Sequence, residues 1–314
     1  MNSKKRLGKG LEDISHLFLS GVPSPPSLGR VQPVIQKQSQ GPAPDTQVWL
    51  TLSLVPRLPS AFFTANLGIE LARAGKRVLA IETGAVPSMD EVLGTVQIHP
   101  SLNDLLEQPQ KQIAVEGPLG MKLLSFQLRL EEIQGFATEE QEILLQVLRK
   151  EEEDAEWVLI HAVYEERSTF HRWVRLVHGV VLTVDLNSET LLQAYQTCKY
   201  LYQLQPDLRI GVMAFGDRDQ EAASAGMKRL SDAVLQFLGK SLEGYGVIPD
   251  DPLIERSLTA KIPLTVLAQT SKAASGFSGA AKRLLLGIEG DSNRLGSAYS
   301  FFGRLQRTVD RVGG

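Results

Sequence analysis

Cysteine is nearly absent from this sequence: Cys198 is the only one among 314 residues. A single cysteine excludes an intrachain disulfide and a zinc site built from cysteines, and it is typical of a reducing cytoplasm. Cys198 falls within a predicted helix, where a cysteine usually serves as a small buried apolar side chain. We therefore assign it no chemistry.

Long hydrophobic runs and an excess of positive charge are also lacking. No stretch approaches the roughly 20 apolar residues of a membrane-spanning helix, and no apolar segment of a secretory signal follows the basic N-terminus. The formal net charge is -3, so no general electrostatic attraction to nucleic acid is expected. We expect a protein that is soluble or that lies on a membrane surface.

Composition divides the chain into segments. Residues 1–20 combine a basic head with a short amphipathic stretch, and residues 21–46 are rich in Pro, Gly, Ser and Gln, as a flexible linker is. A globular pattern covers 47–287, and a last amphipathic segment covers 295–314. The chain is 43% hydrophobic and 22% charged, which suits one sizeable domain with appendages.

Apolar runs of strand length alternate with helical periods in the globular part. Strands are predicted at 47–54, 78–82, 121–126, 156–161, 179–184, 209–215 and 244–248. Helices are predicted at 60–74, 101–107, 138–152, 189–204, 219–239 and 271–286. Three of the predicted strands, "VLAIE", "WVLIHA" and "GVVLTV", are nearly continuous apolar runs, which indicates burial on both faces. The pattern predicts an α/β fold with a mostly parallel sheet of about seven strands, helices on both faces and ligands at the carboxyl ends of the strands.

The turn between the first predicted strand and the first predicted helix lacks glycine and lysine. Its residues are Leu54, Val55, Pro56, Arg57, Leu58, Pro59, Ser60 and Ala61. A phosphate-binding turn needs successive free backbone amides in glycine conformations, together with a lysine and a hydroxyl for magnesium. Pro56 and Pro59 each remove an amide. Arg57 is left as a lone cation, either an anion contact or an exposed turn residue, so the turn is not expected to bind ATP in the usual manner.

The segment "TANLGIELARAGKRVLAIE" nevertheless resembles the region after the P-loop in the MinD/ParA family of deviant-Walker ATPases, which includes the flagellar regulator FlhG. Anchoring on this segment places the family's glycines on Leu54, Pro56, Arg57 and Pro59 of this chain. The signature lysine falls on Val55, the P-loop lysine on Ser60 and the magnesium-binding Ser/Thr on Ala61. The resemblance implies a P-loop NTPase fold whose nucleotide site is degenerate.

Other positions of the family's site are altered as well. The aspartate near the attacking water falls on Glu82 or Thr83, the Walker-B aspartate on His161, and the adenine-reading asparagine on Ala214. His161 could be a metal ligand or general base, but no second ligand is evident, and a histidine with an unrelated hydrogen bond is the alternative. No catalytic, metal or cofactor site is expected. The resemblance continues to about residue 286 through "YGVIPDDPLIERSLTAKIP".

The C-terminal segment 295–314 is predicted to form an amphipathic cationic helix. Apolar Tyr299, Phe301, Phe302, Leu305 and Val309 fall on one side, and Arg304, Arg307 and Arg311 fall on the other. Such a helix suits the surface of an anionic bilayer, and MinD-like proteins carry a membrane-targeting helix at this end. The alternative is a final helix that packs its apolar side on the domain or on a partner.

The N-terminal segment "KKRLGKGLEDISHLF" resembles the peptide by which ParB-type proteins dock on ParA-type ATPases. The candidate docking residues are Lys5, Arg6, Leu7, Lys9, Leu11 and Phe18. Carried on a flexible linker, this segment is suited to be a short recognition element. A basic terminus without a target is the alternative.

These features favour a non-hydrolysing MinD/ParA-like adaptor that helps to organise a bacterial envelope, motility or division machine. The expected partners are a protein, such as an active ATPase of the same fold, and the anionic inner membrane; a homodimer is also compatible. The expected location is the bacterial cytoplasm with peripheral membrane contact. Two alternatives stay open: a working ATPase with an atypical pocket for ATP and Mg²⁺, and a ParA-like nucleoid-associated protein, against which the acidic balance argues.

Overall fold

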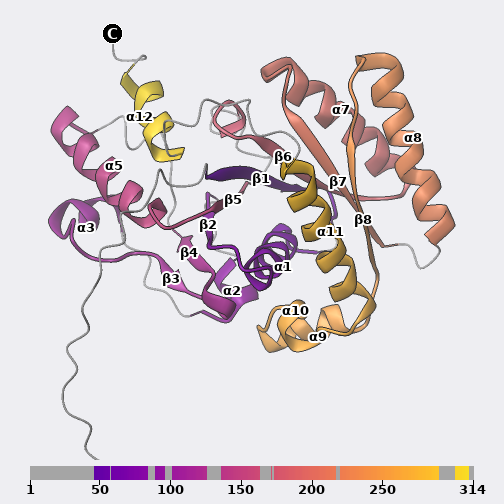
Figure 1. Cartoon of the computed structure of the whole chain (residues 1–314), viewed down its shortest axis with the longest axis horizontal. Helices are drawn as coiled ribbons and strands as arrows, with labels where there is room; N and C mark the ends of the chain where they lie inside the picture. The colour runs from indigo at the N-terminus through magenta and orange to yellow at the C-terminus, as the bar shows by residue number, and fades with distance from the viewer. Residues whose placement is uncertain are drawn as a thin grey trace, which may run out of the picture. The chain divides into compact units, whose positions relative to one another are not determined.

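The computed structural model describes residues 46–56, 58–83, 89–95, 101–125, 136–162, 171, 173–216, 220–289 and 301–310. The chain divides into two compact units, Met1–Pro42 and Ala43–Gly314, and all the described residues belong to the second. The unit is built around one eight-stranded sheet with the order β3-β4-β2-β5-β1-β6-β7-β8 (Figure 1). The predicted head 1–20 and, apart from its last residue, the predicted linker 21–46 lie outside the described residues.

Seven of the strands run parallel, and β3 pairs antiparallel with β4 at one edge. The strands span Gln47–Ser53 (β1), Val78–Glu82 (β2), Val115–Glu116 (β3), Lys122–Ser125 (β4), Trp157–His161 (β5), Gly179–Asp185 (β6), Arg209–Gly216 (β7) and Glu243–Pro249 (β8). Because the seven strands share one direction, their carboxyl ends meet at one edge of the sheet.

Side chains alternate between two hydrophobic cores, one on each face of the sheet. In β1, Val48, Leu50 and Leu52 belong to one core and Trp49 to the other. This two-residue period is a property of the extended backbone, so a strand covered on both faces needs apolar residues at nearly every position. The continuous apolar runs in the sequence reflect this double burial.

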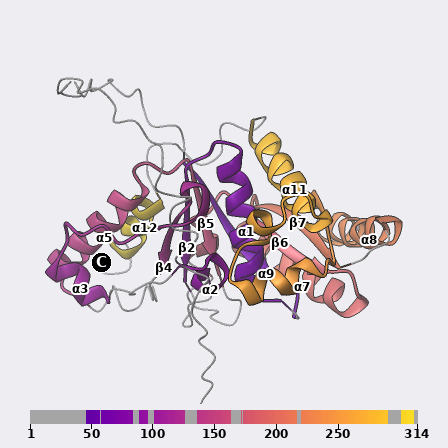
Figure 2. The same ribbon diagram turned by 90° about the horizontal axis from the view of Figure 1, so that it is seen from below.

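Helices cover both faces (Figure 2). The first core is completed by Leu102–Glu107 (α3), Thr138–Glu152 (α5), Ser188–Leu204 (α7), Gln220–Leu238 (α8) and Phe301–Asp310 (α12). The second is completed by Ser60–Arg73 (α1), Met89–Leu93 (α2), Leu253–Ala260 (α9), Leu264–Leu267 (α10) and Lys272–Glu289 (α11). Among the described helices, none is both long enough and apolar enough to cross a bilayer.

The predicted fold class is confirmed: all seven predicted strands and six predicted helices are present, with both faces of the sheet covered. The prediction missed β3, α2, α9, α10 and the 3-10 turn η2 (Pro118–Gly120). β3 has two residues, α10 four and α2 five, and elements of this length contain too few residues for a hydrophobic period to show. Length does not explain the omission of α9, because α9 has eight residues and the predicted α3 has six.

Candidate functional site at the turn before α1

The turn between β1 and α1 lies in the middle of the sheet, because β1 has β5 on one side and β6 on the other. Its first two side chains point into the protein: Leu54 belongs to the first hydrophobic core and Val55 to the second. Both are at most 7% exposed. Apolar side chains therefore anchor the backbone where a phosphate-binding turn would leave room for a ligand.

The backbone amides at the start of the turn are already used within the protein. The Leu54 amide donates to the Thr183 carbonyl at 2.8 Å, and the Val55 amide donates to the Ser53 hydroxyl at 3.2 Å. Pro56 and Pro59 have no N–H to offer. A phosphate needs several successive amides that point outward. Of the remaining turn positions, Leu58 is half-buried, and Arg57 lies outside the described residues.

A row of polar side chains runs from the first residue of α1 across the ends of three neighbouring strands, β5, β2 and β4. Ser60 opens α1, His161 ends β5, Glu82 ends β2 and Ser125 ends β4. These strands are adjacent in the order β4-β2-β5-β1. The Ser60 hydroxyl and Nε2 of His161 lie 2.7 Å apart, and the Ser125 hydroxyl donates to Oε2 of Glu82 at 2.7 Å. The parallel register therefore brings together residues far apart in the sequence.

His161 and Glu82 are the central pair of this row, and each side chain is only 1% exposed. Nδ1 of His161 lies 3.8 Å from Oε1 of Glu82, beyond hydrogen-bond distance. The same Glu82 oxygen accepts the Met89 amide at 2.9 Å. Burial lowers the pKa of His161, and the nearby Glu82 carboxylate acts in the opposite direction. The neutral imidazole is thus the favoured resting form.

We next compared the other positions carried over from the family with the groups that a bound Mg·ATP would need. Ala61 and Ala214 are fully buried and provide no polar atom in their side chains. The described part of the turn contains no lysine, and its one hydroxyl, on Ser60, is hydrogen-bonded to His161. Among the described residues, no group of three or more His, Cys, Asp or Glu side chains is arranged to hold a metal ion. The residues present do not fit Mg·ATP.

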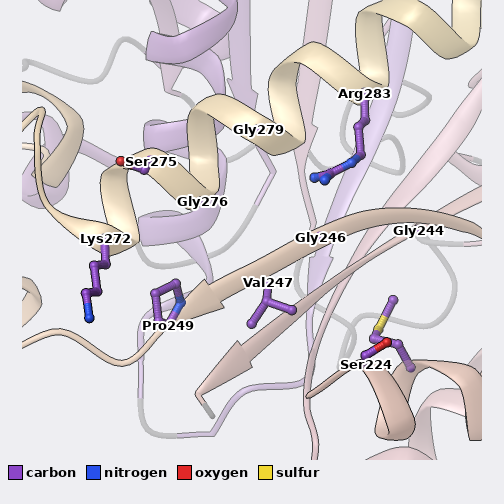
Figure 3. A pocket seen from close by; sticks show the side chains of 11 residues that line it. Ser224, Gly244, Gly246, Val247, Pro249, Lys272, Ser275, Gly276, Gly279 and Arg283 are labelled. Carbon is purple, nitrogen blue, oxygen red and sulfur yellow. The ribbon is translucent and has the colours of Figure 1, made fainter. Parts of the chain in front are cut away.

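The described residues line a cavity of about 680 Å³ at the β8 edge of the sheet, between α8 and α11 (Figure 3). This edge is protected from the addition of another strand. Nη1 of Arg283 donates to the Tyr245 carbonyl at 2.9 Å, and Gly276 of α11 lies against the Val247 carbonyl, only 2.7 Å from where a β-carbon would stand. Pro249 has no N–H. The cavity has a mixed lining in which the cations Lys272 and Arg283 stand beside Met227, Val247 and Pro249.

The C-terminal helix α12 packs on the domain beside α5 (Figures 1 and 2). The Phe301 and Phe302 amides donate to the two carboxylate oxygens of Glu152 at 2.6 and 3.0 Å. The Phe301 ring stacks on Trp173 at 5.4 Å. Phe301, Phe302 and Leu305 are at most 1% exposed. The expectation that these three residues present an apolar surface to lipid is corrected: the domain core buries them.

This arrangement is the one that the alternative interpretation of the tail anticipated. Arg304 is half-buried, and Arg307 and Val309 lie in the last turns of α12. Tyr299 and Arg311 lie outside the described residues. Outside them too lie the candidate docking residues of the N-terminal head, Lys5, Arg6, Leu7, Lys9, Leu11 and Phe18.

Sequence considerations named Ser60, Glu82 and His161 separately and missed that they form one row. The sequence did show that each of them lies at or after the carboxyl end of a predicted strand. To infer that they meet, one must also know that these strands are neighbours in the order β2-β5-β1. Sequence considerations also missed Glu152 as the cap of α12. Its place in the run "KEEEDAE" does not show that Glu151 and Glu152 are buried or that Glu152 is the one that caps α12.

Comparison with known proteins shows which fold this chain has. The sequence matches no protein-family model, and a search of curated proteins finds no significant match. In solved structures the match is clear: this chain has the fold of the MinD/ParA-type P-loop ATPases.

Three of these structures show the extent of the likeness. MinD from Aquifex aeolicus, in the MinC:MinD cell division complex, is 20% identical with a TM-score of 0.58, over 80% of this chain and 98% of that chain. MinD from Pyrococcus horikoshii, complexed with Mg-ADP, is 18% identical with a TM-score of 0.56, over 78% and 99%. A ParA family ATPase from Chlorobium tepidum is 14% identical with a TM-score of 0.55, over 76% and 99%.

Proposed function

We propose that this protein is a non-hydrolysing adaptor with a MinD/ParA-like fold, which helps to organise a bacterial envelope, motility or division machine in space. It acts by binding a protein partner and by peripheral contact with the inner membrane, from the cytoplasmic side. The fold supports a relationship to MinD and ParA proteins, and the altered turn before α1 supports the loss of ATP hydrolysis.

One observation carries the proposal: the turn that would hold phosphate is filled and bonded by the protein itself. Leu54 and Val55 occupy the two cores, their amides bond to Thr183 and Ser53, and Ser60 bonds to His161. To admit a triphosphate, the chain would have to withdraw buried apolar side chains and break these bonds. No lysine in the described turn would then balance the phosphate charge.

The retained scaffold supports a role in binding. The eight-stranded sheet is covered by helices on both faces, so the fold can present binding surfaces without a nucleotide site. The partner that suits such a surface best is an active ATPase of the same fold, and a homodimer is the simpler variant. MinD of Aquifex aeolicus was solved in complex with a second protein, MinC. No DNA-binding role is included, because the chain carries a net charge of -3.

The test is isothermal titration calorimetry of the full chain with Mg·ATP and Mg·ADP. We expect no saturable heat up to about 1 mM nucleotide, a limit that corresponds to a binding free energy weaker than about -4 kcal/mol. MinD of Pyrococcus horikoshii, whose structure holds Mg-ADP, is the positive control. Saturable binding at micromolar nucleotide, or nucleotide density at the turn in a co-crystal, would contradict the proposal and favour an ATPase with an atypical pocket.

A further inference from the structure

The row of side chains Ser60, His161 and Glu82 has a feature that is not explained if these residues only fill the space of a lost phosphate site. Nδ1 of His161 has no hydrogen-bond partner among the described residues, although the side chain is 1% exposed. An unsatisfied buried polar group typically costs about 1–3 kcal/mol, so it calls for a reason. If the empty phosphate position only needed filling, an apolar side chain at 161 would avoid this cost.

The direction of the unsatisfied atom suggests that reason. Nδ1 of His161 lies 3.8 Å from Oε1 of Glu82, a carboxylate that the Met89 amide and the Ser125 hydroxyl hold in place. When Nε2 takes a proton, the imidazolium is attracted to the Glu82 carboxylate beside Nδ1. Burial keeps the resting ring neutral, and Glu82 stabilises the charge that forms on the ring during proton transfer, which is the role of the acid in hydrolytic triads.

Ser60 has the position of a nucleophile. It follows a strand and a turn and opens a helix, and its side chain is half-buried, whereas His161 behind it is covered. The chain order Ser60, Glu82, His161 is the serine–acid–histidine order that triads have in α/β-hydrolases, although the glycines of their turn are missing here. The amide of Ala61, in the first turn of α1, has no partner within the helix and can face a developing oxyanion.

We propose that Ser60 is an activated nucleophile that accepts an acyl group from a small carboxylic ester or thioester, with His161 as general base and Glu82 as the positioning residue. Ser60 Oγ forms a bond to the carbonyl carbon while its proton passes to Nε2 of His161. The carbonyl electron pair moves to the oxygen and returns when the tetrahedral intermediate collapses. The bond to the alcohol or thiol breaks, and the leaving group takes the proton from Nε2. Water then releases the acid from Ser60 by the same two steps.

The first experiment treats the full chain with a fluorophosphonate probe and locates the adduct by mass spectrometry. Ser60 Oγ forms a bond to phosphorus, fluoride leaves, and the serine proton passes to His161. We expect one adduct on Ser60, none in Ser60→Ala, and labelling at least tenfold slower in His161→Gln. Ser188→Ala is the matched control, because Ser188 also opens a helix shortly after a strand; it should label at the unchanged rate. No adduct on Ser60, or equal labelling of Ser60→Ala, would overturn the proposal.

A second measurement reports on the pair even if His161→Gln is unstable. In Ser60→Cys, the rate of iodoacetamide alkylation against pH gives the pKa of the new thiol. Cys198 contributes no background, because burial raises its pKa to about 12. We expect the thiol introduced at position 60 to titrate between about 4 and 7, as thiols paired with histidine do. Ser188→Cys controls for the helix N-terminus and should titrate clearly higher; equal titration of the two thiols would refute the activation of position 60.

The role of Glu82 as a positioning residue has its own readout. Glu82→Gln in the Ser60→Cys background should raise the thiol pKa towards that of Ser188→Cys, whereas Glu82→Asp, which keeps the charge, should retain most of the depression. A merely structural Glu82 would leave the thiol pKa unchanged in both. The nucleotide titration is a separate test, because the ester chemistry depends on Ser60 whether or not ATP binds.

Discussion

Two buried histidines show how strongly single residues depend on their surroundings here. His161 faces Ser60 and Glu82, whereas Nδ1 of His178 accepts the Val48 amide at 3.0 Å. Burial lowers the pKa of both. For His178 the pKa falls to about 4, through burial first and the nearby charge of Arg304 second. Both rings are therefore neutral in the folded protein at neutral pH, which makes the fold sensitive to acid.

We predict that His178 contributes an acid-dependent loss of stability between about pH 6.5 and pH 4. Below its unfolded pKa of 6.5 the unfolded chain takes up a proton that the folded chain does not bind, so the free energy of unfolding falls with pH and is fully retained only above that value. From pH 7.5 to 4.5 the contribution is about 2 to 3 kcal/mol. His161 acts in the same direction.

Urea unfolding of the native chain and of His178→Asn at the two pH values measures this contribution. The asparagine side-chain oxygen lies where Nδ1 of histidine does, so it can still accept the Val48 amide, and it does not titrate. The variant should lose about 2 to 3 kcal/mol less than the native chain on acidification. An identical loss in both proteins would show that His178 is not the responsible group.

At the scale of elements, the apolar pattern of α12 suits both insertion into a membrane surface and packing against the protein core. Phe301, Phe302 and Leu305 are the side chains that a membrane-bound helix would insert, and here they fill the core beside α5. Lipid and core favour the same amphipathic pattern, since both remove apolar surface from water. The proposed membrane contact therefore requires α12 to leave its place, where Glu152 accepts two amides of its first turn and the core buries Phe301 and Phe302.

We predict that Glu152→Ala loosens α12, because it removes the acceptor of two helix-terminal amides, a loss of about 1 to 2 kcal/mol. Hydrogen exchange of residues 301–310 should become faster. Glu151→Ala is the matched control: Glu151 is the neighbouring buried carboxylate of α5, and it accepts the Ile113 amide instead. It should leave the exchange of α12 unchanged.

The same variants test the membrane role. Glu152→Ala should sediment with anionic vesicles more than the native chain does, and deletion of 295–314 should abolish sedimentation. If all three proteins sediment equally, α12 has no part in membrane contact, and its role is to complete the core.

At the scale of the whole molecule, the protein has the fold of solved MinD and ParA structures. Leu54 and Val55 of the turn before α1 are buried in its two cores. Under the proposed function, the fold has been kept while its nucleotide site has been lost. A large apolar core tolerates such a change, because the sheet is stabilised by burial and not by the ligand.

We predict that the N-terminal head serves recognition and not folding. Deleting residues 1–20 should leave the thermal midpoint unchanged, because the compact unit Ala43–Gly314 does not include them. The deletion should abolish capture of an active MinD/ParA-type ATPase from the source lysate, identified by mass spectrometry. Replacing linker residues 21–40 by a Gly/Ser sequence of equal length should preserve capture. Equal capture by the deleted chain would assign the head no role.

Sequence periodicity was sufficient for the long elements. A helix such as α5 and a strand such as β6 repeat their period several times, so their existence and nearly their ends follow from the pattern. The two-residue β3 and the four-residue α10 were missed, because their placement depends on contacts with β4 and α1. The filled turn was predicted in part: the missing glycines and lysine are visible in the sequence, but the bonds that occupy it are not.

The sequence by itself determined the α/β class and the mostly parallel sheet, because these depend on local periodicity. From the chemistry of proline, glycine and lysine it also predicts a turn unsuited to phosphate. Only the tertiary structure decided that Ser60 meets His161, that Glu82 stands behind it and that α12 is covered by the core. The physical reason is the order of strands. Contacts such as Ser60 with His161 and Glu152 with Phe302, 101 and 150 positions apart, arise from which element lies beside which, and a local pattern does not contain that order.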